Sequence, residues 1–168
     1  MTEVKRLFDF PYYQLENYPQ EAALVSKENG TWVKTSTQQY IDQANAISRG
    51  LIKLGVKAND KVAIISMTNR TQWNICDIGI LQTGAQDVPI YPTISEQDYE
   101  YVLNHSESKY VFVSCKEVLD KINKIKANVP TLLGVYSFED IDGCDSWQEV
   151  ITLGNDNQDL QQEVQKRM

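Results

Sequence analysis

The segment from Lys61 to Thr93 constrains the fold more than any other part of this 168-residue chain. It opens with four consecutive apolar residues, Val62 to Ile65, which do not alternate with polar ones. A strand without alternation is typical of a parallel sheet, because helices cover both faces of such a sheet. An apolar helix over about residues 70–83 and a second strand over 87–91 follow, so the segment predicts one β-α-β unit.

The same alternation of strands and helices continues through the rest of the middle region. Ser36 begins a capping box with Gln39, and Ser95 caps a later helix. The predicted elements are helices over about 37–54, 70–83, 96–105 and 117–126, and strands over 61–66, 87–91, 109–114 and 132–138. Such an order requires right-handed crossovers. The predicted fold class is therefore α/β, a doubly wound, mainly parallel sheet with helices on both faces.

The helix over 70–83 is apolar around most of its circumference. At helical spacing, its apolar residues point in several directions. They are Trp73, Ile75, Cys76, Ile78, Ile80 and Leu81. One four-stranded sheet can cover only one side of such a helix. We therefore expect further protein, or a second copy in a homodimer, to cover the opposite side.

Changes in pattern along the chain predict three regions. Residues 1–30 show weak periodicity and several aromatic side chains, which predicts an arm lying on a larger body. Residues 31–138 form the α/β lobe and begin with a short strand over 31–35. Residues 139–168 carry eight acidic and two basic residues, and they predict an acidic segment that is mostly helical or frayed.

Composition argues against several classes of partner. A net charge of −7 disfavours nucleic-acid binding, which needs a basic surface. No apolar run is long enough to span a membrane, and no apolar core of a secretory signal follows the polar residues 1–6. The three cysteines form no CxxC pattern and His105 is the only histidine, so we expect no metal centre. The expected location is the cytoplasm.

Asn69 and Arg70 are predicted to lie just beyond the carboxyl end of the first core strand. Ligands bind at this edge in open α/β sheets, and the free N–H groups of the following helix suit an anion. The alternative is structural: Asn69 caps the helix and Arg70 pairs with a nearby carboxylate. The sequence favours the structural role.

The next strand and the turn that follows it form a second candidate binding site. Pro89 lacks an N–H group, which predicts an edge strand or an irregular one. Tyr91, Pro92 and Thr93 then form a stiff turn at the carboxyl end of that strand. This turn either shapes the wall of a pocket or serves as a connector that directs the next helix, and both interpretations remain open.

Common phosphate-binding and nucleophile motifs are absent from the sequence. We find no GxGxxG, GxxxxGK[ST] or GxSxG pattern. No pair of acidic residues closes the first core strand, which disfavours a phospho-acceptor receiver domain. A nucleotide-binding stress protein is also disfavoured, because a glycine-rich phosphate loop is expected there.

Several short motifs follow one another in a fixed order between Thr31 and Leu133. They include Asn69-Arg70 with Trp73, the run from Val88 to Thr93, and His105-Ser106-Glu107, none of which is diagnostic alone. The others are Trp32 with Thr35, Gly50-Leu51 with Leu54-Gly55-Val56, Asp60 to Ile64, and Gly84-Ala85. In this order and at these separations, they resemble the N-terminal part of the adenylate-forming acyl-CoA synthetases, in particular the long-chain fatty acid–CoA ligases.

The resemblance implies a parent enzyme that joins a fatty acid to CoA through an acyl-adenylate formed from Mg-ATP. The family's Thr/Ser/Gly-rich phosphate loop, Tyr-Gly-x-Thr-Glu element, ribose-binding Asp and C-terminal domain with its catalytic Lys are not found in this sequence. We therefore assign no catalytic, cofactor-binding or metal-binding residue here. The residues kept as scaffold motifs near a site are Asn69, Arg70, Trp73, Pro89, Tyr91, Pro92 and Thr93.

The chain is thus expected to be an inactive N-terminal fragment. Its expected partner is the remainder of the parent enzyme, which would bind ATP, Mg²⁺, CoA and the fatty acid in the cytoplasm or at the periphery of a membrane. The alternative is a stand-alone binding or interaction module that kept the fold and lost the chemistry. A reading frame that continues past Met168 into a Thr/Ser/Gly-rich loop would favour the fragment.

Overall fold

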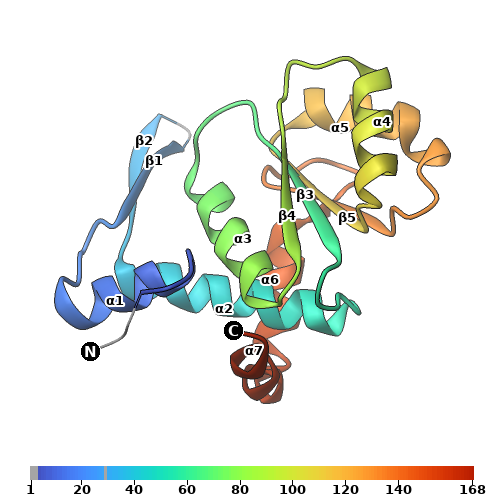
Figure 1. The fold of residues 1–168 in the computed structure, drawn as a ribbon. Coiled ribbons are helices and arrows are strands. Elements are labelled where there is room, and N and C mark those ends of the chain that lie inside the picture. Colours follow the sequence, from blue (N-terminus) through green and yellow to red (C-terminus); the bar gives the residue numbers. More distant parts are fainter. Residues whose placement is uncertain (1–3, 29) are drawn as a thin grey trace.

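A five-stranded parallel sheet forms the centre of the computed structural model, which describes residues 4–28 and 30–168 (Figure 1). The strands lie in the order β4-β3-β5-β6-β7, and each pairs in parallel with its neighbour. Their bounds are β3 Lys61–Ile65, β4 Gln86–Ile90, β5 Tyr110–Val113, β6 Gly134–Ser137 and β7 Asp145–Ser146. The helices between them are α3 Thr71–Gln82, α4 Glu96–Ser106 and α5 Lys116–Ile125.

This arrangement confirms the predicted α/β fold with a parallel sheet. The predicted capping box at Ser36 is present, and Ser36 accepts a hydrogen bond from the Gln39 N–H group at 3.2 Å. The predicted cap at Ser95 is also present and forms a second capping box. The strand β7 is an addition to the prediction. It has two residues, too few to show any periodicity in the sequence, and it joins the sheet by pairing with β6.

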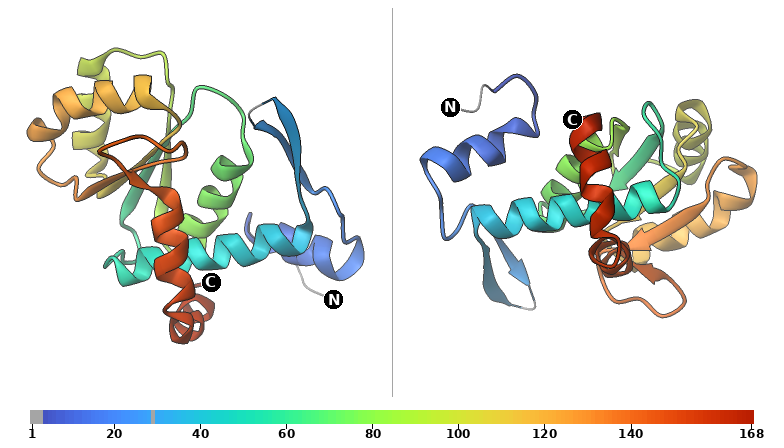
Figure 2. Two further views of the ribbon diagram at one scale, coloured as in Figure 1. Left: turned by 180° about the vertical axis from the view of Figure 1, so that it is seen from behind. Right: turned by 90° about the horizontal axis from the view of Figure 1, so that it is seen from below.

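Helices cover both faces of the sheet, because the side chains of each strand alternate between two cores. Val62 and Ile64 of β3 pack on one face with residues of α2 (Thr37–Lys53), α3 and α6 (Trp147–Asn155). Ala63 and Ile65 pack on the opposite face with α4 and α5. The two views of Figure 2 show this three-layer arrangement.

The predicted acidic segment after residue 138 is well packed, and most of it is helical. Helix α6 crosses α2, and α7 (Gln161–Arg167) follows a 3₁₀ turn over Gln158–Leu160 (Figure 2). Trp147 and Val150 are buried in the core, and the buried Arg49 donates a hydrogen bond to the Gly154 carbonyl group at 2.8 Å. The acidic residues of this segment therefore form its outer surface.

The N-terminal arm consists of a helix and a hairpin that project from the lobe (Figure 1). Helix α1 spans Asp9–Asn17, and β1 (Leu24–Glu28) pairs antiparallel with β2 (Thr31–Thr35) in a separate two-stranded sheet. Of the predicted arm 1–30, residues 1–3 and 29 lie outside the described part. The hairpin spans the predicted boundary at residue 30, because β2 pairs with the arm and not with the main sheet.

The prediction that additional protein is needed to cover α3 is wrong for most of the helix. Helix α2 covers a second side, where Gly79 lets Ile47 approach closely. On a third side, Ile78 packs with Phe8 of the arm and Ala44. Two further elements of the same chain, α2 and the N-terminal arm, thus cover the sides of α3 that the sheet leaves open.

The crossing of α2 and α6 gives a first testable prediction. A Cβ atom added at Gly154 would overlap the Ala46 carbonyl oxygen, which is part of rigid helix backbone. We expect Gly154→Ala to lower the free energy of unfolding by about 2–3 kcal/mol, because the two helices must separate. Urea denaturation would measure the change.

The control is Thr152→Ala, an exposed position in the same helix. It should change stability by less than about 0.5 kcal/mol. Equal stability of the Gly154→Ala variant and the unmodified chain would contradict the close helix contact.

Candidate functional site

A groove lies at the carboxyl ends of β3 and β4, the sheet edge where the sequence analysis placed the candidate residues. Its volume is about 710 Å³. Six of the seven predicted residues line it: Asn69, Trp73, Pro89, Tyr91, Pro92 and Thr93. The structure thus brings together two motifs that lie about twenty residues apart in the sequence.

Arg70, the seventh residue, faces a smaller adjoining cavity of about 280 Å³ that Asn69 and Trp73 also line. Its guanidinium group donates a hydrogen bond to the Ser114 carbonyl group at 2.8 Å and lies 5.5 Å from the Phe138 ring centre. It also pairs with the Glu139 carboxylate at 3.6 Å. Arg70 therefore ties α3 to the ends of β5 and β6, and of these contacts the sequence predicted only the pairing with a carboxylate.

Asn69 does not cap helix α3, so this part of the prediction is wrong. The N-cap position is occupied by Arg70, whose side chain makes no capping hydrogen bond. Asn69 lies one residue earlier, and its side chain is exposed at the rim of the groove. Its amide has no hydrogen-bond partner among the described residues, so it is available to a ligand.

Pro89 lies in an edge strand, as predicted, because β3 is the one described strand that pairs with β4. The Gln86 N–H group donates to the Asp60 carbonyl group at 2.8 Å. Alternate residues of a strand direct their backbone groups to the same side. Pro89 is therefore one of the residues that face the open edge, and its missing N–H group removes no hydrogen bond from the sheet.

The turn after β4 supports one wall of the groove. The Pro92 carbonyl group accepts a hydrogen bond from the hydroxyl group of Tyr99, a buried residue of α4, at 2.8 Å. Tyr91 is 76% exposed and Thr93 is also exposed, so both are accessible at the rim. The turn thus connects to the next helix and also lines the groove, which unites the two interpretations left open by the sequence.

Within the described part of the chain, the groove offers binding groups but no strong acid or base. Its ten lining residues carry amide, hydroxyl, thioether and aromatic groups, with no carboxylate, imidazole or amine. His105 lies elsewhere, exposed on α4 and stacked on Tyr101 with ring centres 5.6 Å apart. This arrangement can hold a ligand, but it contains no group that would act as a general base at neutral pH.

Sequence reasoning missed a pair of carboxyl groups, Asp77 on α3 and Asp87 on β4. Burial, together with a hydrogen bond to Asp77, raises the pKa of Asp87 to about 8. Burial also raises the pKa of Asp77. The signal in the sequence was an aspartate inside an apolar helix and another inside a strand, and only the fold shows that they meet.

The part of the chain that the structure describes has no cluster of three metal-binding side chains. Within the same residues, every helix is too short or too polar to cross a bilayer.

Comparison with known proteins identifies a matching family. The family described as AMP-binding enzyme matches residues 12–166. The chain is 30% identical over 152 residues to the long-chain-fatty-acid–CoA ligase ACSBG2 of Xenopus laevis, covering 88% of this chain and 20% of that protein. It is 36% identical over 104 residues to the long-chain-fatty-acid–CoA ligase FadD15 of Mycobacterium bovis, covering 62% of this chain and 17% of that protein. The chain thus spans about a fifth of the length of these relatives.

Solved structures show the same fold. A putative long-chain-fatty-acid CoA ligase from Rhodopseudomonas palustris superimposes with a TM-score of 0.75 at 18% identity. The match covers 87% of this chain and 36% of that one. At this identity, the likeness concerns the arrangement of helices and strands alone.

The contacts of Arg70 give a second testable prediction. Arg70→Ala removes the hydrogen bond to Ser114 and the contact with Phe138, and we expect it to lower the free energy of unfolding by about 2 kcal/mol. Asn69→Ala is the matched control and should change stability by less than about 0.5 kcal/mol. Guanidinium denaturation measures the free energy of unfolding of both variants. Equal values for Arg70→Ala and the unmodified chain would show that Arg70 has no structural role.

The carboxyl pair gives a third prediction, on pH. The unfolded chain releases the Asp87 proton near pH 3.8, whereas the folded chain keeps it to about pH 8. The folded state therefore binds more protons in this window, and stability should fall as pH rises from 5 to 8. We expect a loss of about 1–2 kcal/mol, less than the full shift implies because both groups are partly exposed.

Asp87→Asn should remove most of this pH dependence, because an amide cannot titrate. Asp142→Asn, at an exposed position beside the opposite edge of the sheet, is the control and should retain it. Urea denaturation at several pH values between 5 and 8 measures the effect. Identical pH profiles for Asp87→Asn and the unmodified chain would contradict the assignment.

Proposed function

Because this chain belongs to the AMP-binding enzyme family, we propose that it is the N-terminal part of a long-chain fatty acid–CoA ligase. The observation that carries the proposal is the match over residues 12–166, combined with relatives that share 30% and 36% identity and are named as such ligases. The parent reaction would join a fatty acid to CoA through an acyl-adenylate, with ATP consumed and AMP and pyrophosphate released.

In this proposal the chain supplies a scaffold and no reacting group. The groove at the ends of β3 and β4 has no carboxylate that could hold Mg²⁺. The neighbouring Arg70 is already engaged by Ser114 and Phe138, which disfavours a role in binding phosphate. The residues described here therefore do not fit Mg-ATP by themselves, and we derive no step through it.

The proposed role of the seven motif residues follows from these contacts. Arg70 fixes the start of α3 against the sheet, and the Pro92 carbonyl group fixes the turn after β4 against α4. Asn69, Trp73 and Tyr91 then present their side chains to the groove. We propose that they line a surface completed by the remainder of the enzyme, which is the expected partner, in the cytoplasm or at the periphery of a membrane.

The fourth prediction is that the purified 168-residue chain forms no acyl-CoA from a long-chain fatty acid, Mg-ATP and CoA. The physical reason is that its described residues present no site for the phosphates and no acid–base group at the groove. Chromatographic detection of acyl-CoA and of AMP measures the activity, and a full-length ligase such as FadD15 serves as positive control.

A circular dichroism spectrum with the expected helix and strand content would show that an inactive sample is folded. Turnover by the folded chain that scales with its concentration would contradict the proposal that it is an inactive part of a longer enzyme.

A further inference from the structure

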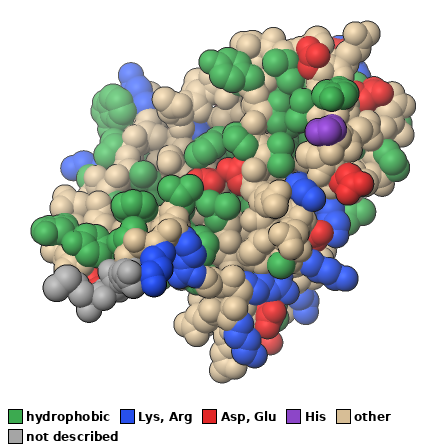
Figure 3. Space-filling view, viewed as in Figure 1, with side chains coloured by type: hydrophobic (Ala, Val, Ile, Leu, Met, Phe, Trp, Pro, Cys, Tyr) green, Lys and Arg blue, Asp and Glu red, His purple; other side chains and the backbone are tan. Residues whose placement is uncertain are grey.

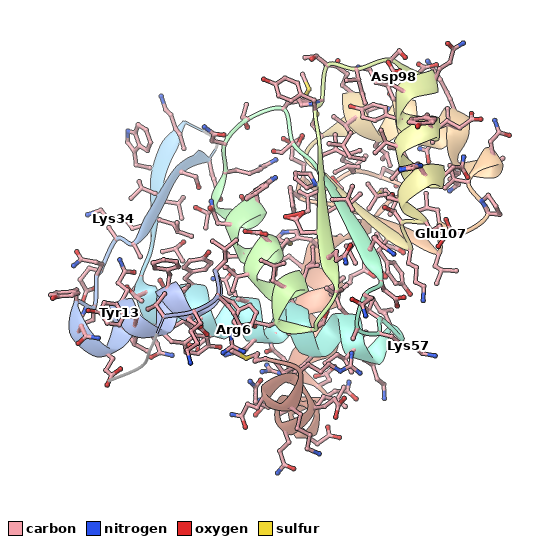
Figure 4. The ribbon with its side chains drawn as sticks, viewed as in Figure 1. Arg6, Tyr13, Lys34, Lys57, Asp98 and Glu107 are labelled. Atoms are coloured by element: carbon pink, nitrogen blue, oxygen red, sulfur yellow. The ribbon has the colours of Figure 1, made fainter. Side chains whose placement is uncertain are left out.

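A second cavity, apart from the groove, lies between the N-terminal arm and helix α3. Its volume is about 500 Å³, which is in the range of pockets that bind small molecules. Its walls are mainly apolar and come from α1, the start of β1, Tyr40 of α2, and Ile78 of α3. Tyr13, labelled in Figure 4, belongs to the α1 side of this cavity. Leu7 and Phe10 at its rim are 62% and 57% exposed.

Among the described residues that line the cavity, one carries a charge, and this is the carboxyl group of Asp77. Two of the other polar side chains there, Gln14 and Tyr40, already have partners. The amide oxygen of Gln14 accepts a hydrogen bond from the Thr37 hydroxyl group at 2.9 Å. The hydroxyl group of Tyr40 donates to the Asn74 carbonyl group at 3.2 Å. Because it carries a charge, Asp77 is the group that would give the cavity its preference for one class of ligand.

No cation of the described residues compensates the charge of this carboxyl group. Neither Asp77 nor its neighbour Asp87 forms an ion pair with a described lysine, arginine or histidine. One oxygen of Asp87, Oδ1, is buried without a hydrogen-bond partner. Arg6 of the arm, labelled in Figure 4, is held by Asp9 at 2.9 Å. Figure 3 shows acidic atoms enclosed by hydrophobic side chains over this part of the molecule.

An occupant of this cavity must satisfy two conditions. Its body must be apolar, since most of the lining side chains are aliphatic or aromatic. Its polar end must carry positive charge and N–H donors, because Asp77 accepts hydrogen bonds and the chain has a net charge of −7. A carboxylate would be repelled by Asp77, and a neutral alcohol would leave the charge of the carboxyl group uncompensated.

We propose that the cavity between α1 and α3 is a binding site for a small alkylammonium compound, whose apolar body fills the cavity and whose ammonium group pairs with Asp77. The ammonium group brings the positive charge that no described lysine, arginine or histidine supplies to this carboxyl pair. This site is separate from the groove and does not depend on the proposed ligase function.

The test compares three probes of equal length: hexylammonium, hexanol and hexanoate. Isothermal titration calorimetry at pH 7 measures their affinities for the 168-residue chain. We expect hexylammonium to bind with a stoichiometry of one and at least tenfold more tightly than hexanol, with hexanoate weaker still. Equal affinities for hexylammonium and hexanol would overturn the proposal.

Variants show whether the selectivity comes from this cavity. Asp77→Asn, which keeps the shape of the side chain, should abolish the preference for hexylammonium, whereas Asp142→Asn makes the same change in net charge elsewhere and should retain it. Ala23→Phe fills the cavity from its wall and should weaken hexylammonium and hexanol alike. If Asp77→Asn binds hexylammonium as tightly as the unmodified chain, the ammonium group does not use this site, and the proposal fails.

Discussion

The burial of β3 on both faces is the constraint on which the rest of the structure depends. Residues 62–65 are all fully buried, so the chain must supply a layer of helices on each side of the sheet. One layer comes from α4 and α5, which are close to β3 in sequence. The other requires α2 from before the sheet and α6 from after it, and these two helices meet through Gly50 and Gly154. The acidic C-terminal segment is therefore part of the core and not an appendage.

The sequence predicted those elements whose signals are local. The capping box at Ser36, the apolar run in β3 and the proline of an edge strand each depend on a few adjacent residues, and each is found as predicted. Features that depend on distant contacts could not be predicted in this way. The two residues of β7 become a strand only because β6 lies beside them. The hydrogen bond of Arg70 reaches a carbonyl group 44 residues away, so its partner is not visible in the local sequence.

The candidate site shows the same division. Two motifs were placed at the carboxyl ends of neighbouring strands by the general rule for parallel sheets, and they do share one groove. The pairing of Asp77 with Asp87 was missed, because a helix residue and a strand residue approach each other only when α3 packs back on β4. The different roles of two adjacent residues could not be predicted from the sequence either. Arg70 is hydrogen-bonded to the Ser114 carbonyl group, whereas Asn69 beside it faces solvent.

The position of Pro89 has a consequence for how this protein meets other chains. An exposed edge strand invites a second strand to add to the sheet, which is a common start of aggregation. At the open edge of β4, the proline offers a carbonyl group and a ring in place of a donor. A regular strand can therefore pair with only part of this edge. Association along it must be selective, and only a partner shaped to accommodate the proline can extend the sheet.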